Sequence, residues 1–376
     1  MIRYELVTSQ ARHRRTAFGV IVKPVSSRDR GAAVRRMVTC AALCLSLLFT
    51  STAHAEEEFP GWYASMISGS DRLALYSAAR AGIEDAIPQF IYRTGGMHRG
   101  VAPQVIARDI RARPILYYAT NFNGGIPGTQ INLGGLDFTI DEESRAKSGI
   151  AAGASVSGGL VASYRKGSLL RLSFGSSAEW LTGEGLRRQQ LGVSACGQHH
   201  LGGWTWLDGC ISAVRVWRSY DTHVSQQNIS LGPTMIYTAG GMDQQLGLRA
   251  TRQFHDDGPQ NGLEADWIGA VPDLGAVSVG LEWAEVLEGE NTSLRGLSLG
   301  LVRPADHHPV EFSLNYNETG GYRLAGKDRE DRTVSLGLNM PLTEKFSLNA
   351  MIGRRNSTIA AYDESFWRFN VDLRDW

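Results

Sequence analysis

Three groups of histidine and aspartate residues are the first candidates for chemistry in this chain. His255-Asp256-Asp257 places an imidazole beside two carboxylates, a combination that can activate water for hydrolysis. The pairs His199-His200 and His307-His308 offer nitrogen ligands to a metal ion, but no third ligand stands close by in the sequence. The first group lies among Asp and Gly residues typical of a solvated turn. We therefore expect no catalytic residue, no bound metal and no cofactor.

Other functional signatures are missing as well. No Gly-x-Ser-x-Gly elbow stands between a strand and a helix, and no phosphate loop or dinucleotide fingerprint occurs. The net charge of the chain is zero, and residues 1–55 carry nine Lys/Arg and two Asp/Glu, which is +7. The remainder is therefore near −7 (0 minus 7), so we expect no nucleic-acid partner.

The N-terminal residues 1–55 have the pattern of a presequence. A twelve-residue, mostly apolar run at 38–49 follows Arg35 and Arg36, and Ala53-His54-Ala55 comes after it. This order predicts a secretory signal peptide with cleavage after Ala55. A membrane anchor is the alternative, but a helix needs about 20 residues to cross a bilayer. No run of 18 apolar residues follows Ala55, so we expect no transmembrane helix in the mature chain.

The second half of the chain alternates apolar and polar residues. Val310, Phe312 and Leu314, for example, interleave with Glu311 and Ser313. A period of two predicts strands with one apolar and one polar face. We expect fourteen strands, beginning near Ile115, Ile150, Leu169, Gln189, Trp204, Ser225, Gln244, Leu263, Ala276, Leu294, Val310, Thr333, Phe346 and Phe366.

The pattern of connections indicates how these strands are arranged. The long connections follow odd-numbered strands, and most short ones follow even-numbered strands, as in barrels with short turns on one side of a membrane. Charged strand residues, such as Arg249, Glu264 and Arg332, fall mostly on the polar phase, and aromatic residues gather near strand ends. The predicted fold is all-β: an antiparallel transmembrane β-barrel of about 14 strands over residues 114–376, in the outer membrane of a Gram-negative bacterium.

Residues 56–113 differ from the strands that follow them. Leu73, Tyr76 and Ile83 lie on one stripe of a helix expected from Asp71 to Ile87, with Ser70 or Asp71 as its cap and Pro88 at its end. We interpret 56–113 as a short periplasmic helical segment that leads into the barrel.

Cys196 and Cys210 are the cysteines left after the signal peptide. Their midpoint is residue 203, so a hairpin turn at Gly202-Gly203 would place them opposite each other. In an oxidising periplasm this arrangement favours a disulfide. Two free thiols are the alternative, because a slip of one residue would put the side chains on opposite faces.

Two segments resemble a known family. Asn121, Asn123, Gly124 and Gly125 lie at the end of the first expected strand, where a long connection begins. That connection carries an acidic and then Ser-Arg-Ala pattern, with Asp141, Ser144, Arg145 and Ala146. Together with the last hairpin, from Gly353 to Trp376, these residues resemble the C-terminal barrel of the surface lipoprotein assembly modifier family.

The resemblance implies a fourteen-stranded outer-membrane barrel that helps lipoproteins reach the cell surface, without any enzymatic reaction. Outer-membrane lipids and a surface lipoprotein client are the partners it implies. Two features depart from the family. Residues 56–113 are shorter than two 34-residue helical repeats, so we expect no periplasmic repeat domain. Outer-membrane barrels often end in an aromatic residue that is in phase with the last strand, whereas Trp376 is out of phase with Leu373.

Three functions therefore stay open from the sequence. The leading hypothesis is a barrel for translocation or surface display of lipoproteins. The second is a passive porin-like channel, and the third is a barrel enzyme.

Overall fold

The computed structural model describes residues 61–373, except 134, 220–223, 306–307, 325 and 344–345. The predicted signal peptide, with its apolar run at 38–49 and its cleavage site after Ala55, lies outside the described residues.

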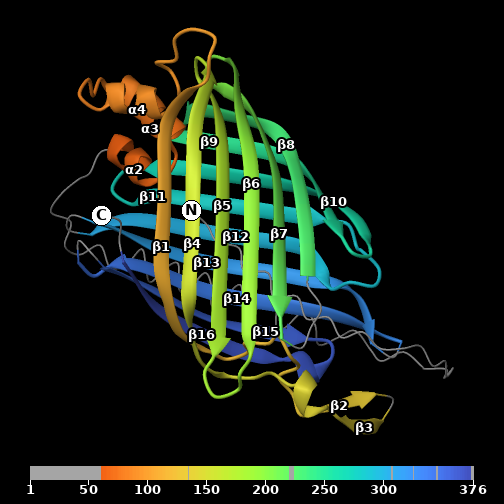
Figure 1. Ribbon diagram of the computed structural model, residues 1–376. Helices are drawn as coiled ribbons and strands as arrows, with labels where there is room; N and C mark the ends of the chain where they lie inside the picture. Colours follow the sequence, from red (N-terminus) through yellow and green to blue (C-terminus); the bar gives the residue numbers. More distant parts are fainter. Residues whose placement is uncertain are drawn as a thin grey trace. The chain divides into compact units, whose positions relative to one another are not determined.

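Fourteen strands form one antiparallel sheet whose order follows the sequence (Figure 1). Each strand between the first and the last pairs with its two neighbours in this order, and the sheet curls until its first and last strands come near each other at one end. The predicted fourteen-stranded antiparallel barrel is confirmed. Its strands are β1 Gln104–Ala119, β4 Gly149–Arg165, β5 Ser168–Leu181, β6 Arg187–Gly202, β7 Thr205–Arg218, β8 Val224–Ala239, β9 Met242–His255, β10 Gly258–Val271, β11 Gly275–Ala284, β12 Thr292–Ala305, β13 His308–Leu324, β14 Lys327–Pro341, β15 Phe346–Ser357 and β16 Glu364–Leu373.

The predicted start of the barrel at residue 114 is wrong. Strand β1 begins at Gln104, and Pro114 lies inside it, opposite Ala154 of β4. Among the described residues β1 is hydrogen-bonded to β4 alone, and a proline, which lacks the N–H group of a strand residue, is tolerated in such a strand. Apart from this first strand, every strand starts within six residues of its predicted position.

The helical segment also differs from its prediction. It contains α2 (Gly61–Ile67), α3 (Asp71–Ala81) and α4 (Ile87–Arg93) instead of one long helix. Ser70 caps α3 by accepting a hydrogen bond from the Leu73 N–H, as predicted. Gly82 ends α3 in the left-handed conformation (φ 71°), and Pro88 lies in the first turn of α4. Proline is favourable there, because the first turn of a helix leaves its N–H groups unpaired.

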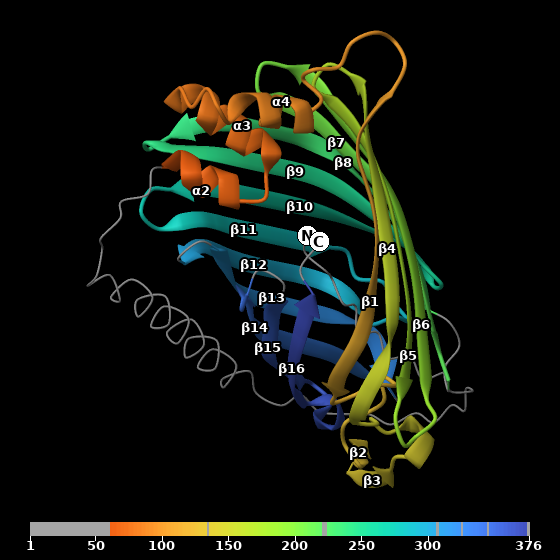
Figure 2. The ribbon, with the colours of Figure 1, turned by 60° about the vertical axis from the view of Figure 1, so that its left-hand side comes forward.

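The connections between strands are of two kinds, one at each end of the barrel. The helices lie at the end with the turns β4–β5, β6–β7 and β8–β9, which we call the short-turn end (Figure 2). The opposite, long-loop end carries the connection 120–148, which contains a small hairpin, β2 (Gln130–Leu133) and β3 (Leu136–Thr139), and the 3-10 turn η1 (Glu142–Ser144). The connection from β15 to β16 contains a second turn, η2 (Ala360–Tyr362).

Two connections predicted as long outer loops are instead continuous hairpins. The β9–β10 turn lies at Asp256-Asp257, and β13 extends to Leu324 before β14 begins at Lys327. Polar residues pair across the longer hairpin, as in the Arg323–Asp328 ion pair of 2.5 Å. Both faces of this extension are polar, so it lacks the alternation that identifies a half-apolar strand.

The barrel wall separates apolar from polar side chains. Alternate residues of the strands place large apolar side chains on the outer surface, where Ile110 is 77% and Ile211 is 60% exposed. This outward set includes Leu116, Ile150, Leu172, Phe174, Val193, Leu231, Leu248, Leu263, Leu281, Leu336, Ile352 and Phe369. The opposite phase carries small and polar residues into the lumen, as in the hydrogen bond between Ser173 and Ser194. No helix in the described part of the chain is long and apolar enough to cross a membrane.

Candidate functional site

At the short-turn end, the helical segment packs against the inner wall of the barrel. Leu73 of α3 is fully buried against Trp206 of β7 and Ile236 of β8. Tyr76 extends this contact, because its ring meets the Trp204 ring edge-on with centroids 4.9 Å apart. Residues 61–98 therefore form a docked segment whose apolar face covers the lumen side of the strands rather than their outer surface.

Charged and polar side chains fix the position of this docked segment. The Arg72 guanidinium donates two hydrogen bonds, of 3.0 and 2.7 Å, to the Asp208 carboxylate of β7. These two side chains are only 12% and 14% exposed. The Ser70 hydroxyl donates to Gln245 Oε1 at 2.6 Å, and Arg80 Nε donates to Asp243 at 2.8 Å.

Backbone contacts complete the docking on the neighbouring strands. The N–H of Gly167, in the β4–β5 turn, donates to the Gly95 carbonyl at 3.0 Å. A side chain on Gly95 would overlap Leu169 and Ser163, and Gly95 also has a positive φ of 74°. The docked segment thus reaches from β4 to the Pro272 turn, which lies against Gly61 of α2.

At the long-loop end, the residues of the family resemblance come together. Asn123 Nδ2 donates to the Arg145 carbonyl at 2.8 Å, and Asn123 Oδ1 accepts from the Lys147 N–H at 2.8 Å. Asn121 Nδ2 donates to the Gly125 carbonyl at 2.8 Å. These bonds tie the end of β1 to the start of β4, so they fix the conformation of the loop between them.

Backbone pairing continues the same arrangement. The Ile126 N–H donates to the Ser144 carbonyl at 2.8 Å, and the Ala146 N–H donates to the Ile126 carbonyl at 2.9 Å. Asp141 belongs to this turn, since its carbonyl accepts from the Ser144 N–H at 3.0 Å. We call this set, residues 121–126 and 141–147, the loop cluster. Its motif residues bind one another, which indicates a structural role.

Two glycines of the loop cluster are required by close approach. A side chain on Gly125 would overlap the Arg145 carbonyl. Gly124 has φ +68°, and a Cβ there would lie 2.7 Å from an Arg218 guanidinium nitrogen. The loop therefore approaches the Arg218 side chain of β7, and a larger residue at Gly124 would displace that guanidinium.

The first loop also packs on the connection between β15 and β16. Ile126, Ile131 and Ile140 form a buried cluster with Ile359 and Tyr362. The Gly128 N–H donates to the Ala361 carbonyl at 2.8 Å. The loop that leaves the first strand is thus held by the loop that precedes the last strand.

A buried ionic group supports this packing, and no sequence pattern identified it. Arg329 is almost completely buried, pairs with Asp331 through two nitrogens, and stacks 3.7 Å from the centre of the Tyr362 ring. Arg355 Nε donates to the Tyr362 carbonyl, and Arg355 Nη2 donates to Glu364 at 2.6 Å. Burial raises the pKa of the Tyr362 phenol, although the charge of Arg329 partly opposes this.

The lumen holds further paired charges. Arg188 donates to Glu179 at 2.7 Å and to the Tyr117 hydroxyl at 2.6 Å, and Arg249 pairs with Glu264 and Asp266. Charges at these depths would be costly against lipid, about 2–4 kcal/mol each at the midplane. The expected lumen position of Arg332 is wrong. Arg332 and Glu318 both lie on the outward phase and pair with each other. A charge is tolerated on this face because the pair lies near the long-loop end, beyond the apolar belt.

Cys196 and Cys210 occupy paired positions of β6 and β7 and form a disulfide. Their Cα atoms are 4.1 Å apart, and the neighbouring pair Ser194 and Ser212 shares their side of the sheet. The disulfide joins two strands that are already hydrogen-bonded, so it reinforces the wall on which the docked segment packs.

Two of the three histidine groups are parts of packed structure, and the third, His307-His308, falls where the side chains lie outside the described residues. His255 Nδ1 lies 3.2 Å from Glu290, and both side chains are nearly buried. His199 stacks on Tyr164, and His200 packs beside Trp206. No group of three or more His, Cys, Asp or Glu residues in the described ranges could hold a metal ion.

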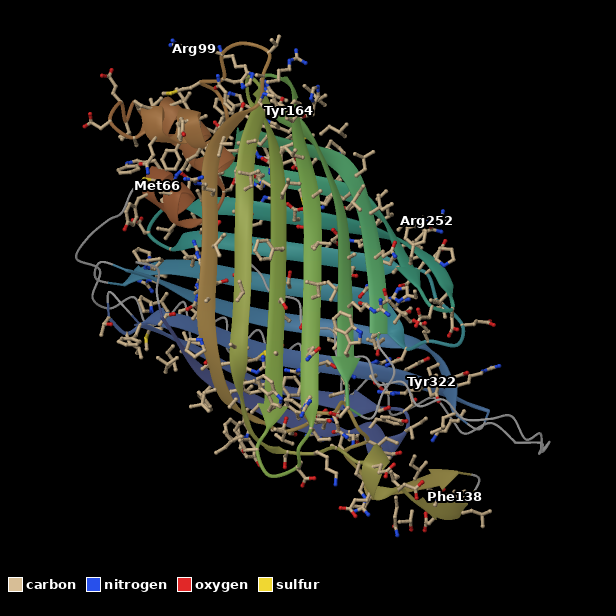
Figure 3. The ribbon with its side chains drawn as sticks, in the orientation of Figure 1. Met66, Arg99, Phe138, Tyr164, Arg252 and Tyr322 are labelled. Carbon is tan, nitrogen blue, oxygen red and sulfur yellow. A yellow bond between two sulfur atoms is a disulfide. The ribbon has the colours of Figure 1, made fainter. Side chains whose placement is uncertain are left out.

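Aromatic residues distinguish the outer belt from the interior. Trp180, Trp217, Trp283 and Trp367 are 36–48% exposed and lie toward the long-loop ends of their strands. Side chains of this kind anchor a protein at the lipid headgroups. Trp206 and Tyr362, in contrast, are buried inside. Figure 3 shows the labelled Tyr164 and Phe138 at opposite ends of the molecule.

An antiparallel barrel with an apolar outer wall, a polar lumen and exposed aromatic residues toward its rim is a transmembrane β-barrel of the Gram-negative outer membrane. Comparison with models of known families finds no match, and comparison with curated proteins finds none either. Among solved structures, the chain is similar to the translocator domain of the autotransporter NalP from Neisseria meningitidis, with 14% identity, 80% of this chain and 98% of that chain covered, and a TM-score of 0.30. It is also similar to the beta domain of the Bordetella autotransporter Brka, with 12% identity, coverage of 71% and 98%, and a TM-score of 0.28.

Proposed function

We propose that this barrel assists the translocation or surface display of polypeptides, with lipoproteins as its clients, and that it catalyses no reaction. One observation carries the proposal: residues 61–98 are docked on the lumen wall by buried side chains, including the Arg72–Asp208 pair. A folded segment at the entrance would obstruct passive flow through the lumen. A translocator needs a lumen that stays closed until a client arrives.

The loop cluster supports the same function at the other end. Its residues fold the first long loop toward β7, so the long-loop end is also narrowed. The motif that resembles the surface lipoprotein assembly modifier family thus shapes a loop at the end that faces the cell exterior, because periplasmic turns of such barrels are the short ones. A client chain would meet the docked segment first and the loop cluster last.

Single-channel recording in planar bilayers tests this proposal. We expect the purified mature chain to show low or rare conductance, because both ends are narrowed. Large, steady, ohmic currents from the intact chain would instead favour the porin-like channel.

Display is tested separately in cells. We expect a lipoprotein reporter, co-expressed with the barrel, to become sensitive to external protease on intact cells. A barrel with Arg72→Ala and Asp208→Ala serves as a comparison, because it keeps the wall but loses the docking pair. Equal protection of the reporter with and without the barrel would contradict the proposal that lipoproteins are the clients.

The third hypothesis, a barrel enzyme, has its own test. His255→Ala and Asp256→Ala change the residues best suited to activate water. We expect identical, background hydrolysis of peptide and ester substrates by the wild type and both variants.

A further inference from the structure

The two faces of the barrel wall differ in charge along strands β5 to β12. In the described part of these strands, the carboxylates lie on the lumen phase: Glu179, Asp208, Asp243, Glu264, Asp266 and Glu282. The outward phase carries arginines. Residues opposite each other in an antiparallel pair share a face, and Arg187, Arg215, Arg252 and Arg295 lie opposite the exposed Trp180, Leu191, Ile229 and Trp283. These four lie toward the long-loop ends of their strands, whereas Arg303, also outward, lies at the short-turn end.

A shallow apolar depression of about 440 Å³ lies beside Arg252 on the outer face. Ala250, two residues before Arg252, is opposite Leu231 of β8 and Leu263 of β10. These two leucines are 55% and 57% exposed. A small side chain between two large ones leaves a groove, and the walls of this groove are hydrocarbon. A hydrocarbon chain therefore fits it better than a polar ligand does.

Polar and aromatic groups lie at the rim side of this groove. The Arg252 guanidinium lies 5.6 Å from the centre of the Phe254 ring, and Asn261 is opposite Arg252. Trp283, which lines the depression, is opposite Arg295 of the next strand. An exposed tryptophan of this kind marks the depth of the lipid headgroups. The groove thus leads from the apolar belt to two outward arginines at headgroup depth.

One carboxylate stands near these groups. Glu285, just beyond β11, accepts a hydrogen bond from Asn261 Nδ2 at 2.9 Å. Arg252 makes no ion pair with Glu285 or with any other carboxylate in the described ranges. Its guanidinium therefore has its hydrogen-bond donors available to a ligand outside the wall.

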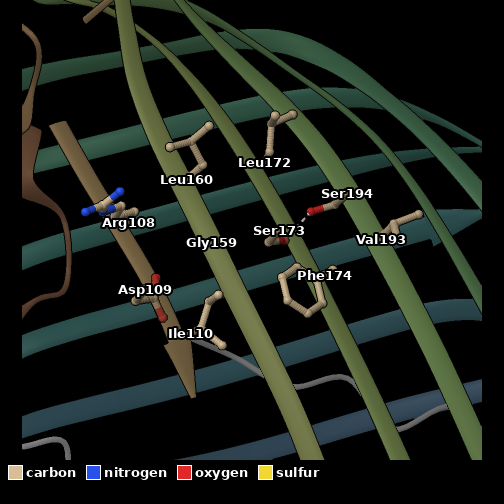
Figure 4. A pocket seen from close by; sticks show the side chains of 10 residues that line it. All are labelled: Arg108, Asp109, Ile110, Gly159, Leu160, Leu172, Ser173, Phe174, Val193 and Ser194. Atoms are coloured by element: carbon tan, nitrogen blue, oxygen red, sulfur yellow. Dashed lines mark hydrogen bonds between the residues drawn. The ribbon is translucent and has the colours of Figure 1, made fainter. Parts of the chain in front are cut away.

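A second depression on the outer face gives a comparison (Figure 4). It is lined by apolar side chains, which include Ile110, Leu172 and Phe174, and by a single arginine, Arg108. Arg108 is on the outward phase, opposite Leu160, in the half of β1 nearer the short-turn end. Apolar grooves thus occur at both depths of the wall, but only the one at Arg252 lies beside a second outward arginine and an exposed tryptophan.

The chemistry of the headgroups at the long-loop end selects the ligand. This end faces the cell exterior, and the outer leaflet there consists of phosphorylated glycolipid. An arginine gains nothing from hydrocarbon, whereas its planar guanidinium donates two parallel hydrogen bonds to a phosphate. Anionic headgroups also attract basic residues at the membrane surface. A phosphate above an acyl chain matches the order of groups along the depression.

We propose that the depression at Arg252 binds a phosphorylated glycolipid of the outer leaflet, of the lipid A type. The Arg252 guanidinium contacts a phosphate group, the Arg295 guanidinium adds positive charge on the far side of Trp283, and the groove over Ala250 holds an acyl chain. This binding site goes beyond the proposed function and does not depend on it, because it lies on the lipid side of the wall. The bound lipid fixes the depth of this wall in the membrane.

Native mass spectrometry of the full mature chain, released from detergent micelles with lipid A added, tests the phosphate contact. We expect Arg252→Gln to lower the affinity for lipid A roughly tenfold, because a hydrogen bond to a charged group is lost. Arg108→Gln is the matched control, since it also removes an outward arginine beside an apolar depression. Equal losses in the two variants would overturn the inference, because any outward arginine would then bind the lipid.

A change of lipid separates the phosphate from the rest of the ligand. Dephosphorylated lipid A should bind to the wild type and to Arg252→Gln equally, since the guanidinium then has no partner. Phosphatidylglycerol, a phosphate lipid without the sugar headgroup, should bind more weakly than lipid A. A tenfold loss with the dephosphorylated lipid would overturn the contact at Arg252, and equal binding of phosphatidylglycerol would overturn the choice of a glycolipid.

A second pair of variants tests the groove. Ala250→Leu fills the space between Leu231 and Leu263, so the affinity for lipid A should fall severalfold. Ala213→Leu is its control, because it enlarges an outward alanine of β7, opposite Val193 and outside the depression. Both changes add an apolar side chain to a face in contact with lipid, and the heat-dependent shift in gel migration verifies that each barrel is folded. Equal affinities of the two folded variants would overturn the acyl-chain position.

Discussion

The two ends of the lumen are narrowed by different kinds of contact. At the short-turn end, the docked segment is held mainly by side chains, such as the Arg72–Asp208 pair and the packing of Leu73 on Trp206. At the long-loop end, the loop cluster is held by hydrogen bonds within one loop, from the Asn123 side chain and from the Ile126 backbone, and by the close approach of Gly125 to Arg145. The first set of contacts joins two preformed surfaces, whereas the second exists only in one folded conformation of a loop.

This difference indicates which end of the lumen can open. A docked helix can exchange its ion pairs and hydrogen bonds for water without unfolding, because α3 keeps its own cap at Ser70. The loop cluster would lose its internal hydrogen bonds, and each buried group left unpaired costs about 1–3 kcal/mol. We therefore infer that the docked segment is the movable closure and that the long-loop end is a fixed constriction.

Deletion of residues 61–98 should give the largest effect. The short-turn end would lose its docked segment, so we expect frequent, steady channel openings in planar bilayers where the intact chain shows few. The control is Leu136→Ser with Phe138→Ser, which changes only exposed side chains of the β2–β3 hairpin (66% and 50% exposed). If the deletion left the conductance low, the long-loop end alone would close the lumen, and the comparison would fail.

Arg72→Ala should loosen the docked segment without removing it. Loss of one partner from a largely buried pair leaves the Asp208 charge uncompensated, at a cost of about 3 kcal/mol. Hydrogen exchange at the α3 amides should become faster, with a smaller rise in channel openings. Arg93→Ala is the control, because the Arg93–Asp71 pair is 50% and 31% exposed and is worth about 0–1 kcal/mol. Equal effects of both changes would contradict a docking role for Arg72.

Much of this fold could be predicted from the sequence, because apolar and polar residues alternate wherever one face of a strand meets lipid. The strands from Gly149 to Leu373 carry that pattern, and their order follows directly from short connections. The start of the first strand was mispredicted because Pro114 marks a strand end in most contexts, and only the pairing with Ala154 shows that it lies inside the strand. The extension of β13 to Leu324 was missed because its two faces are equally polar.

The candidate sites were less predictable. The residues of the loop cluster could be found, since Asn and Gly at fixed spacings indicate a specific loop. Their partners could not, because Asn123 meets Arg145 across 22 residues. Arg72 and Asp208 are 136 residues apart, and ordinary surface charges look the same in a sequence. Only the three-dimensional arrangement identifies them as a pair.

Gly125→Ala should disturb the long-loop end alone. The added methyl group would overlap the Arg145 carbonyl, and overpacking of this kind costs about 1–3 kcal/mol. Hydrogen exchange should accelerate at the amides of Ile126 and Ala146, with no change in α3. Gly175→Ala is the matched control, because nothing lies within 4 Å of a Cβ at that lumen position. Faster exchange in α3 of Gly125→Ala would show that the two ends are coupled, contrary to the comparison.

The smallest expected effect concerns alkaline pH and Tyr362. Burial raises the pKa of this phenol above its usual value, which is about 10, so the folded loop favours the neutral form. The stability that this adds is complete below the usual pKa and is lost as the pH rises through the raised value. The absorbance difference between wild type and Tyr362→Phe should therefore show a tyrosinate that forms only above the usual tyrosine pKa.

The same titration distinguishes the response of the long-loop end from that of the short-turn end. Hydrogen exchange in the wild-type loop should accelerate over the range in which Tyr362 ionises, because a buried phenolate is costly. The Tyr362→Phe loop, which has no such proton to lose, should not respond in this way. Exchange in α3 should be the same in both proteins, since its docking surface does not include Tyr362. A difference spectrum with a midpoint at or below the usual tyrosine pKa would contradict the buried position of this ring and the fixed constriction built on it.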